Sequence, residues 1–254
     1  MIGLHDEYEV MFRVESRLWW YRILHGKVLR QIQRQFGNNR TLRVLDAGCG
    51  TGGMLSFLQN NGYQNLQGLD LSEDAVAFTR ARGLNVRQLD LRDVGTLPPE
   101  PFDVIICNDV FCYLTDDEIR HVMTEFRNRL QPGGLFITNN NALKAFEGVH
   151  SIVLKIPRRF NLNEFTVFGK AVGMPLRYGT YWSFLLAPLI WGYRKAQLLG
   201  IRLRILKLQN LHSDVGYPGD GINGLLYGLV RAEEQVLPKA PFGSSVFVVY
   251  QRPA

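Results

Sequence analysis

Short apolar runs alternate with amphipathic stretches along most of this chain of 254 residues. Apolar residues three or four apart over residues 5–36 predict an amphipathic helix, with a break expected near Gly26. Strands are expected at 42–45, 66–71, 84–91, 102–110, 135–138, 176–181 and 244–252, with helical spacing between most of them. The alternation predicts an α/β fold with a doubly wound, seven-stranded, mostly parallel sheet, whose last strand is antiparallel at the edge.

This pattern divides the chain into three parts. Residues 1–40 are expected to form an N-terminal helical lid, residues 41–182 and 243–254 the core, and residues 183–242 a C-terminal helical insertion. The insertion is longer than a connection between the last two strands needs, and its periodicity predicts helices over 184–197 and 223–236. A helical hairpin of this kind could form an acceptor pocket, a dimer face or a membrane-contact patch.

The first predicted strand runs into the glycine-rich stretch Asp46-Ala47-Gly48-Cys49-Gly50-Thr51-Gly52-Gly53. Its glycines permit a tight turn and a close approach of the backbone to a ligand, and their spacing is also the GxGxxG dinucleotide fingerprint. Many strand-turn-helix units carry such glycines for steric reasons alone. Asp46 favours one kind of ligand, because a carboxylate here repels a pyrophosphate and attracts an ammonium or a sulfonium.

Further acids end the next two predicted strands. Asp70 follows the second strand and Asp90 the third, while Asn108 lies in the fourth. The carboxyl ends of parallel strands meet at one edge of the sheet, where ligands bind in such folds, so these side chains are expected to converge there with Asp46. An acid in the place of Asp70 can accept two hydrogen bonds from a ribose diol.

The stretch from Asp46 to Gly52 resembles motif I of the class I S-adenosylmethionine-dependent methyltransferases, in which an acid precedes GxGxG, and Leu130-Gln131-Pro132-Gly133-Gly134 matches the L-x-PGG step of that family. The resemblance covers residues 42–140. It implies a Rossmann-like methyltransferase fold, with S-adenosyl-L-methionine as cofactor and S-adenosyl-L-homocysteine as product. The cofactor-binding residues it implies are Asp46, Gly48 and Gly50 for the methionine part, Asp70 and Leu71 at the ribose, Asp90 and the Leu91 amide for adenine, and Asn108 at the floor.

The aromatic stretch Trp19-Trp20-Tyr21-Arg22 lies in the predicted lid. Aromatic faces suit a sulfonium, so Trp20 and Arg22 are further candidates for cofactor binding. The alternative is that these rings pack on the sheet.

Two residues are candidates for handling the acceptor. Many relatives have a Glu-His pair where this chain has Cys112-Tyr113, so a base is in doubt there, although Tyr113 could orient an acceptor by hydrogen bonding. Asp109 could be a base or a cap, and a structural role is favoured. His150-Ser151 resembles the His-Asp pair of a bacterial methyltransferase subgroup of type 11/12. His150 is the first choice for a general base, since imidazole titrates near working pH; the alternative is a loop histidine with a structural hydrogen bond.

Composition and charge indicate which kinds of binding partner to expect. The net charge is +6, but Lys and Arg are spread thinly, which disfavours nucleic acid as the partner. The three cysteines form no CxxC pair, as expected of reduced thiols in a cytoplasmic protein, and no metal site is predicted. No signal peptide is expected, and the apolar run 184–191 is too short to cross a bilayer. Basic residues among apolar ones in the insertion would suit a lipid-linked acceptor or peripheral contact with the inner face of the membrane.

The predicted function is transfer of a methyl group, by in-line displacement, to an oxygen or nitrogen nucleophile of a small-molecule, glycan or lipid-linked acceptor. Two alternatives remain. The missing Glu-His and His-Asp pairs would suit a partner subunit that binds the cofactor without catalysis. The GxGxxG spacing and Asp70 would allow an NAD(P)-dependent oxidoreductase.

Overall fold

A computed structural model describes residues 5–98, 100–206 and 216–253, and its strands form one sheet in the order β3-β2-β1-β4-β5-β7-β6. The strands are β1 (Val44–Ala47), β2 (Leu66–Asp70), β3 (Val86–Gln88), β4 (Phe102–Ile106), β5 (Leu130–Asn141), β6 (Leu176–Trp182) and β7 (Ser245–Gln251). The first five strands pair in parallel, and β7 runs antiparallel to both β5 and β6. The predicted doubly wound, mostly parallel sheet is confirmed.

The position predicted for the last strand is wrong, although its direction is right. β7 lies between β5 and β6, so β6 forms the edge. Five consecutive residues of β7, from Val246 to Tyr250, are completely buried, as in a strand covered on both faces. In β6, by contrast, buried and partly exposed residues are mixed, as suits an edge.

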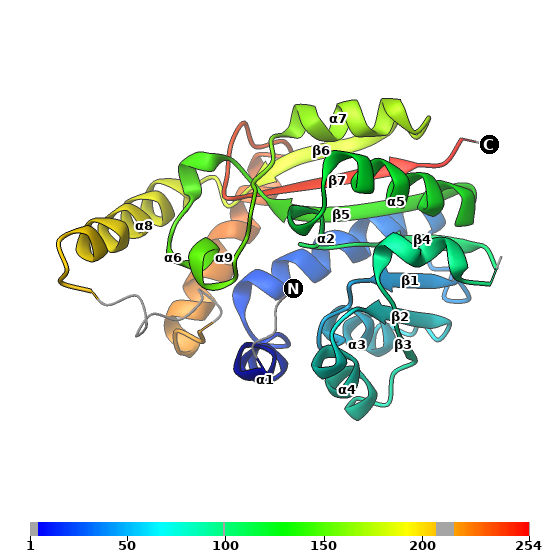
Figure 1. Cartoon of the computed structure of the whole chain (residues 1–254), viewed down its shortest axis with the longest axis horizontal. Helices are drawn as coiled ribbons and strands as arrows, with labels where there is room; N and C mark the ends of the chain where they lie inside the picture. The colour runs from blue at the N-terminus through cyan, green and yellow to red at the C-terminus, as the bar shows by residue number, and fades with distance from the viewer. Residues whose placement is uncertain (1–4, 99, 207–215, 254) are drawn as a thin grey trace.

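Helices cover both faces of the sheet (Figure 1). They are α1 (His5–Val14), α2 (Trp19–Phe36), α3 (Gly53–Asn60), α4 (Glu73–Ala81), α5 (Asp116–Arg129), α6 (Val149–Val153), α7 (Leu162–Ala171), α8 (Ala187–Arg202) and α9 (Asp220–Val236), with short 3-10 turns η1 (Leu91–Thr96), η2 (Phe111–Tyr113) and η3 (Lys144–Phe146). One core cluster includes Phe126 of α5 and Phe165 of α7, and the other includes Val28 of α2, Leu55 of α3 and Val230 of α9.

The N-terminal helix breaks at a different place from the one predicted. Gly26 lies inside α2, and the chain turns instead between α1 and α2, where Leu18 is extended. A helical glycine costs about 1 kcal/mol relative to alanine, and burial of the neighbouring Leu24 and Val28 outweighs that cost. α2 packs against the sheet, whereas α1 packs against α4. Residues 1–4 of the predicted lid lie outside the described residues.

Strand boundaries also differ from expectation. β4 ends at Ile106, so Asn108 follows the fourth strand instead of lying in it. β3 ends at Gln88, so Asp90 begins η1 as its N-cap instead of ending a strand. β5 starts at Leu130 and includes the Pro-Gly-Gly step, where its pairing with β4 shifts register and Gly133 has a φ of 77°. A bulge of this kind needs a residue that tolerates a left-handed backbone, which glycine provides.

The predicted insertion forms two helices. α8 begins and ends later than expected, whereas α9 begins earlier and ends where expected. α9 packs on α2, where the backbone N–H of Trp19 donates to Asn223 at 2.7 Å. α8 extends away from the sheet at one end of the molecule (Figure 1). Residues 207–215 of the predicted insertion lie outside the described residues.

Candidate active site

A cavity of about 770 Å³ lies over the carboxyl ends of β1, β2 and β4. Its walls come from α1, α2, α6, α8 and the loops that follow the strands. All but one of the predicted site residues line it: Trp20, Asp46, Gly48, Gly50, Asp70, Leu71, Asp90, Leu91, Asn108, Tyr113 and His150. The chain therefore brings together residues more than a hundred positions apart, as the sheet topology requires.

The exception is Arg22. Its guanidinium lies 3.9 Å from the ring centre of Tyr227 on α9, and Arg22 is not among the residues that line the cavity. Residues two apart on a helix point to different sides, so Trp20 faces the cavity while Arg22 turns toward α9. The structure does not support cofactor contact by Arg22.

The glycine turn approaches the cavity closely with its backbone. Gly48, Gly50 and Gly52 have φ values of 84°, 54° and 81°, a region that side chains rarely adopt. A Cβ on Gly48 would lie 2.3 Å from a methyl carbon of Val110. The Gly50 N–H donates to the Asp70 carboxylate at 2.8 Å, so the turn and the second strand-end acid are held as one unit.

Buried carboxylates at this edge of the sheet favour the binding of a positively charged group. Burial, with the nearby carboxylates of Asp70 and Glu15, raises the pKa of Asp46 to about 8. Burial also raises the pKa of Asp70, against the hydrogen bonds it accepts from the N–H groups of Ser72 and Gly50. An ammonium or sulfonium at this edge would favour the ionised acids and relieve their mutual repulsion. These acids thus fit a ligand that carries both groups.

Asp90 differs from the other two acids. Arg92 donates to its carboxylate from Nε, at 2.9 and 3.0 Å, and from its backbone N–H at 3.0 Å. The Arg92 side chain accordingly lowers the pKa of Asp90. The carboxylate is therefore anchored and ionised at the cavity wall, with Leu91 buried beside it.

Glu15 is a cavity residue that no sequence motif indicated. It lies at the turn between α1 and α2, where it is buried, accepts a hydrogen bond from the Thr51 hydroxyl at 2.6 Å and pairs with Arg82. Burial raises its pKa to about 7. A Cβ on Gly53 would lie 2.2 Å from its carboxylate, so glycine there admits this contact. Glu15 thereby fastens the N-terminal helices to the glycine turn.

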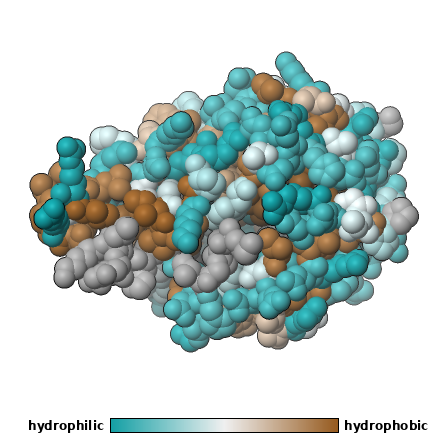
Figure 2. Space-filling view, viewed as in Figure 1, coloured by the Kyte–Doolittle hydropathy of each residue, from teal (hydrophilic) through white to brown (hydrophobic). Residues whose placement is uncertain are grey.

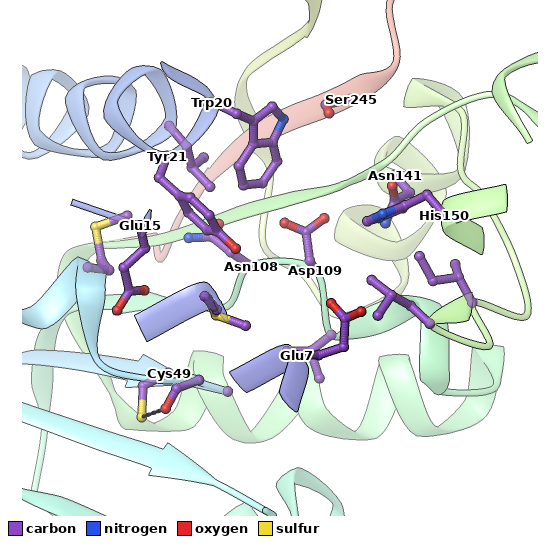
Figure 3. Close-up of a pocket in the computed structure, with 18 of the residues that line it drawn as sticks. Glu7, Glu15, Trp20, Tyr21, Cys49, Asn108, Asp109, Asn141, His150 and Ser245 are labelled. Carbon is purple, nitrogen blue, oxygen red and sulfur yellow. Dashed lines mark hydrogen bonds between the residues drawn. The ribbon is translucent and has the colours of Figure 1, made fainter. Parts of the chain in front are cut away.

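Asp109 points its carboxylate into the middle of the cavity, between Tyr21 on one side and His150 on the other (Figure 3). Its φ is 57°, in a region that Asp tolerates better than most residues. The side-chain amide of Asn139 donates to the carboxylate at 3.2 Å, and burial raises the pKa of Asp109 to about 7. The carboxylate of Asp109 therefore faces the cavity, and Asp109 is not the N-cap of η2, where Val110 takes that position.

The two predicted acceptor residues lie in the same part of the cavity. The Tyr113 hydroxyl donates to the carbonyl of Leu154 at 3.1 Å, and burial raises its pKa above the ordinary value. His150, on α6, and Asn141 both line the cavity (Figure 3). Among the described residues, no group of three or more His, Cys, Asp or Glu is placed to hold a metal ion.

Residues 44–134 match a family model described as a methyltransferase domain. The malonyl-[acyl-carrier protein] O-methyltransferase of Bacillus anthracis is 25% identical over 147 residues, which is 56% of this chain and 54% of that protein. A ubiquinone biosynthesis O-methyltransferase of Bordetella bronchiseptica is 28% identical over 174 residues, 60% of this chain and 71% of that protein. The chain thus spans little more than half the length of the first of these relatives.

Solved structures show the same fold over nearly the whole chain. A SAM-dependent methyltransferase from Archaeoglobus fulgidus has a TM-score of 0.57 at 14% identity and covers 91% of this chain and 93% of its own. An S-adenosylmethionine-dependent methyltransferase from Mesorhizobium loti has a TM-score of 0.56 at 16% identity, covering 88% and 96%.

The fold and the site define an α/β protein with the Rossmann-like methyltransferase architecture. Residues 44–134 match a methyltransferase domain, and the solved structures that share this fold include S-adenosylmethionine-dependent methyltransferases.

Proposed function

We propose that this protein transfers the methyl group of S-adenosylmethionine to an oxygen or nitrogen nucleophile of a small-molecule, glycan or lipid-linked acceptor. One observation carries the proposal: a single cavity joins the acid-ended strands to Asp109, Tyr113 and His150. Its volume of about 770 Å³ is within the range of ligand pockets. The names of the two O-methyltransferase relatives favour oxygen as the acceptor atom.

The cofactor end of the cavity binds by charge and by backbone approach. Asp46 would hold the ammonium of the methionine part, and the backbone at Gly48 and Gly50 would border that part of the cofactor. Asp70 accepts from the ribose diol with Leu71 beside it. Asp90 and the Leu91 amide would hold the adenine. Asn108 closes the floor, and its side-chain oxygen is fixed by the N–H of Asn139 at 2.9 Å. Trp20 supplies an aromatic face near the sulfonium.

The bound cofactor supplies an electrophilic methyl carbon. As the bond from this carbon to sulfur breaks, the acceptor oxygen or nitrogen forms the new bond and its proton passes to a base. Asp109 and His150 both line the cavity, and the carboxylate of Asp109 lies between Tyr21 and His150 (Figure 3). A carboxylate with a pKa of about 7 combines a useful ionised fraction at neutral pH with enough basicity to accept that proton. Tyr113, whose proton is held by Leu154, can accept a hydrogen bond and orient the acceptor.

Labelled methyl groups test the proposal. The protein is incubated with methyl-labelled S-adenosylmethionine and a cell extract, which is then separated into lipid, glycan, nucleic acid, protein and small-molecule fractions. We expect label in one fraction, lost with Asp70→Ala, and calorimetric binding of S-adenosylhomocysteine by the unaltered protein. Binding without label in any fraction would favour a cofactor-binding partner subunit. Binding of NADH in place of S-adenosylhomocysteine would overturn the proposal.

A further inference from the structure

Helix α8 presents large apolar side chains to solvent. Leu189, Trp191 and Leu199 of the helix are 67%, 48% and 55% exposed, and Leu203, its C-cap, is 58% exposed. Beyond the helix, Ile205 is 74% exposed. Figure 2 shows apolar surface gathered at the end of the molecule where α8 lies. Single exposed apolar residues are ordinary, but several on one helix mark a surface that binds a partner. We call these five residues the α8 apolar face.

The charged residues of the segment that carries this face are all basic. Residues 183–206 contain basic residues but no Asp or Glu. Of the basic residues, Arg202 and Arg204 are exposed and Lys195 is partly exposed, whereas Arg194 is buried and donates to the Phe146 carbonyl at 2.6 Å. Apolar residues flanked by Lys, Arg and a Trp are typical of helices that lie in the interface of an anionic bilayer.

We infer that the α8 apolar face docks on an anionic lipid bilayer. Charge decides against a second copy of the chain, because pairing this face with itself would bring cations onto cations. A bilayer with acidic headgroups offers negative charge to Lys195, Arg202 and Arg204, and hydrocarbon to the leucines. This docking is peripheral: no helix among the described residues is long and apolar enough to span a membrane.

The same helix also forms a wall of the candidate active site. Ile190, Tyr193, Arg194 and Gln197, spaced three or four apart, line the cavity. Tyr193 lines the cavity and is also 58% exposed, so the cavity wall continues to the surface beside the α8 apolar face. A docked protein would therefore meet an acceptor carried by a lipid at the cavity mouth. This second step rests on the proposed function, and the docking itself does not.

Vesicle flotation tests the docking without any methyl transfer. The protein is mixed with vesicles of phosphatidylcholine alone or with about one-third phosphatidylglycerol, and binding is expected to be on the order of tenfold or more stronger on the anionic vesicles. The double variant Leu199→Glu with Leu203→Glu should lose this binding. Neither residue lines the cavity, so its affinity for S-adenosylhomocysteine should match that of the unaltered protein and show that it is folded.

The matched control is Val167→Glu, because Val167 lies on α7 and is 53% exposed. This variant should bind the anionic vesicles as the unaltered protein does. Equal loss in the control, or no vesicle binding by the unaltered protein, would overturn the docking. So would a concentration-dependent dimer, measured by light scattering, that Leu199→Glu with Leu203→Glu abolishes.

The acceptor class is read from the labelling experiment. If the acceptor is carried by a lipid, the methyl label enters the organic-solvent extract, and Leu199→Glu with Leu203→Glu lowers labelling of vesicle-borne acceptor while cofactor affinity stays unchanged. Label confined to water-soluble molecules would overturn the lipid-borne acceptor but leave methyl transfer standing. Absence of S-adenosylhomocysteine binding would instead count against the proposed function and leave the flotation result unaffected.

Discussion

Asp109 and Trp182 share one amide, the side chain of Asn139. The indole N–H of Trp182 donates to the Asn139 oxygen at 2.8 Å, and the amide nitrogen of Asn139 donates to the Asp109 carboxylate at 3.2 Å. The indole can only donate, so it sets which end of the amide faces Asp109. Asp109 is also held by its backbone N–H, which donates to the Asn139 carbonyl at 2.7 Å. The cavity carboxylate is therefore oriented from outside the cavity.

Replacing Asp109 by Asn should remove the carboxylate base while keeping the size and shape of the side chain. If Asp109 accepts the proton, kcat falls by about 10²- to 10⁴-fold, while the affinity for S-adenosylhomocysteine changes less than about twofold. In the unaltered protein, kcat/KM should rise as pH increases through about 7, because the base must be ionised. His150→Ala is the matched comparison. If His150→Ala abolishes this rise of kcat/KM with pH, which we call the pH limb, and Asp109→Asn retains the rise, His150 is the base.

Removing the shared amide should move that pH limb. In Asn139→Ala the carboxylate of Asp109 loses a donor that favours its ionised form, so the limb shifts toward higher pH. The Trp182 N–H loses its acceptor as well, which costs about 1–3 kcal/mol of unfolding free energy. Kinetics against pH and urea unfolding measure the two effects separately, and an unmoved limb would show that Asn139 has only a structural role.

Much of the fold and the part of the site formed by the strand ends could be predicted from local sequence patterns. The glycine turn and Asp46 are adjacent in the chain, and a strand followed by an acid can be recognised from a few residues. The parallel topology then brings such ends together. Even the interior position of β7 had a signal, the unbroken apolar run from Val246 to Tyr250, which indicates a strand covered on both faces.

The remainder depended on contacts between distant residues. Glu15 accepts a hydrogen bond from Thr51 and pairs with Arg82. The spacing of residues within 5–36 does not predict these contacts. Asp109 lies in a run that fits a strand end or a cap equally well, and only the positive φ and the partner Asn139 direct it into the cavity. Arg22 was predicted to contact the cofactor, but it lies two residues after Trp20 on α2. That spacing, and not the charge of Arg22, turns its side chain toward α9.

The buried acids should make the ligand-free protein less stable as the pH rises. The folded protein holds the pKa of Asp46 at about 8 and that of Glu15 at about 7, above their ordinary values near 4. The stability that the protonated acids contribute to the folded protein is therefore fully present below about pH 4. It is lost as the pH rises through about 7 for Glu15 and about 8 for Asp46, and each group lowers the free energy of unfolding by at most about 1.4 kcal/mol per pH unit. Tm should fall between pH 5.5 and 8.5.

Asp46→Asn should flatten this dependence, since it removes the group with the higher pKa. Asp117→Asn is the control, because the Asp117 side chain is 93% exposed on α5. Saturation with S-adenosylhomocysteine should also reduce the slope, since its ammonium favours the ionised acid. A Tm that rises over this range, or an equal slope in Asp46→Asn, would show that Asp46 does not bind its proton as the structure indicates.

Gly48→Ala should damage the site more than a glycine replacement elsewhere. The new methyl group would lie 2.3 Å from Val110, and the φ of 84° is itself unfavourable for alanine. Gly83→Ala is the matched control, because its φ is 73° but no atom lies within 4 Å of the place that its Cβ would take. Both should lose about 1–2 kcal/mol of stability from the backbone. Gly48→Ala should lose more and should weaken S-adenosylhomocysteine binding at least about tenfold, since the turn must shift. Val110→Ala in the Gly48→Ala background relieves the contact, so part of the affinity should return. Equal losses in the two glycine variants, with unchanged ligand affinity, would mean that close packing at Gly48 is not what shapes the cofactor site.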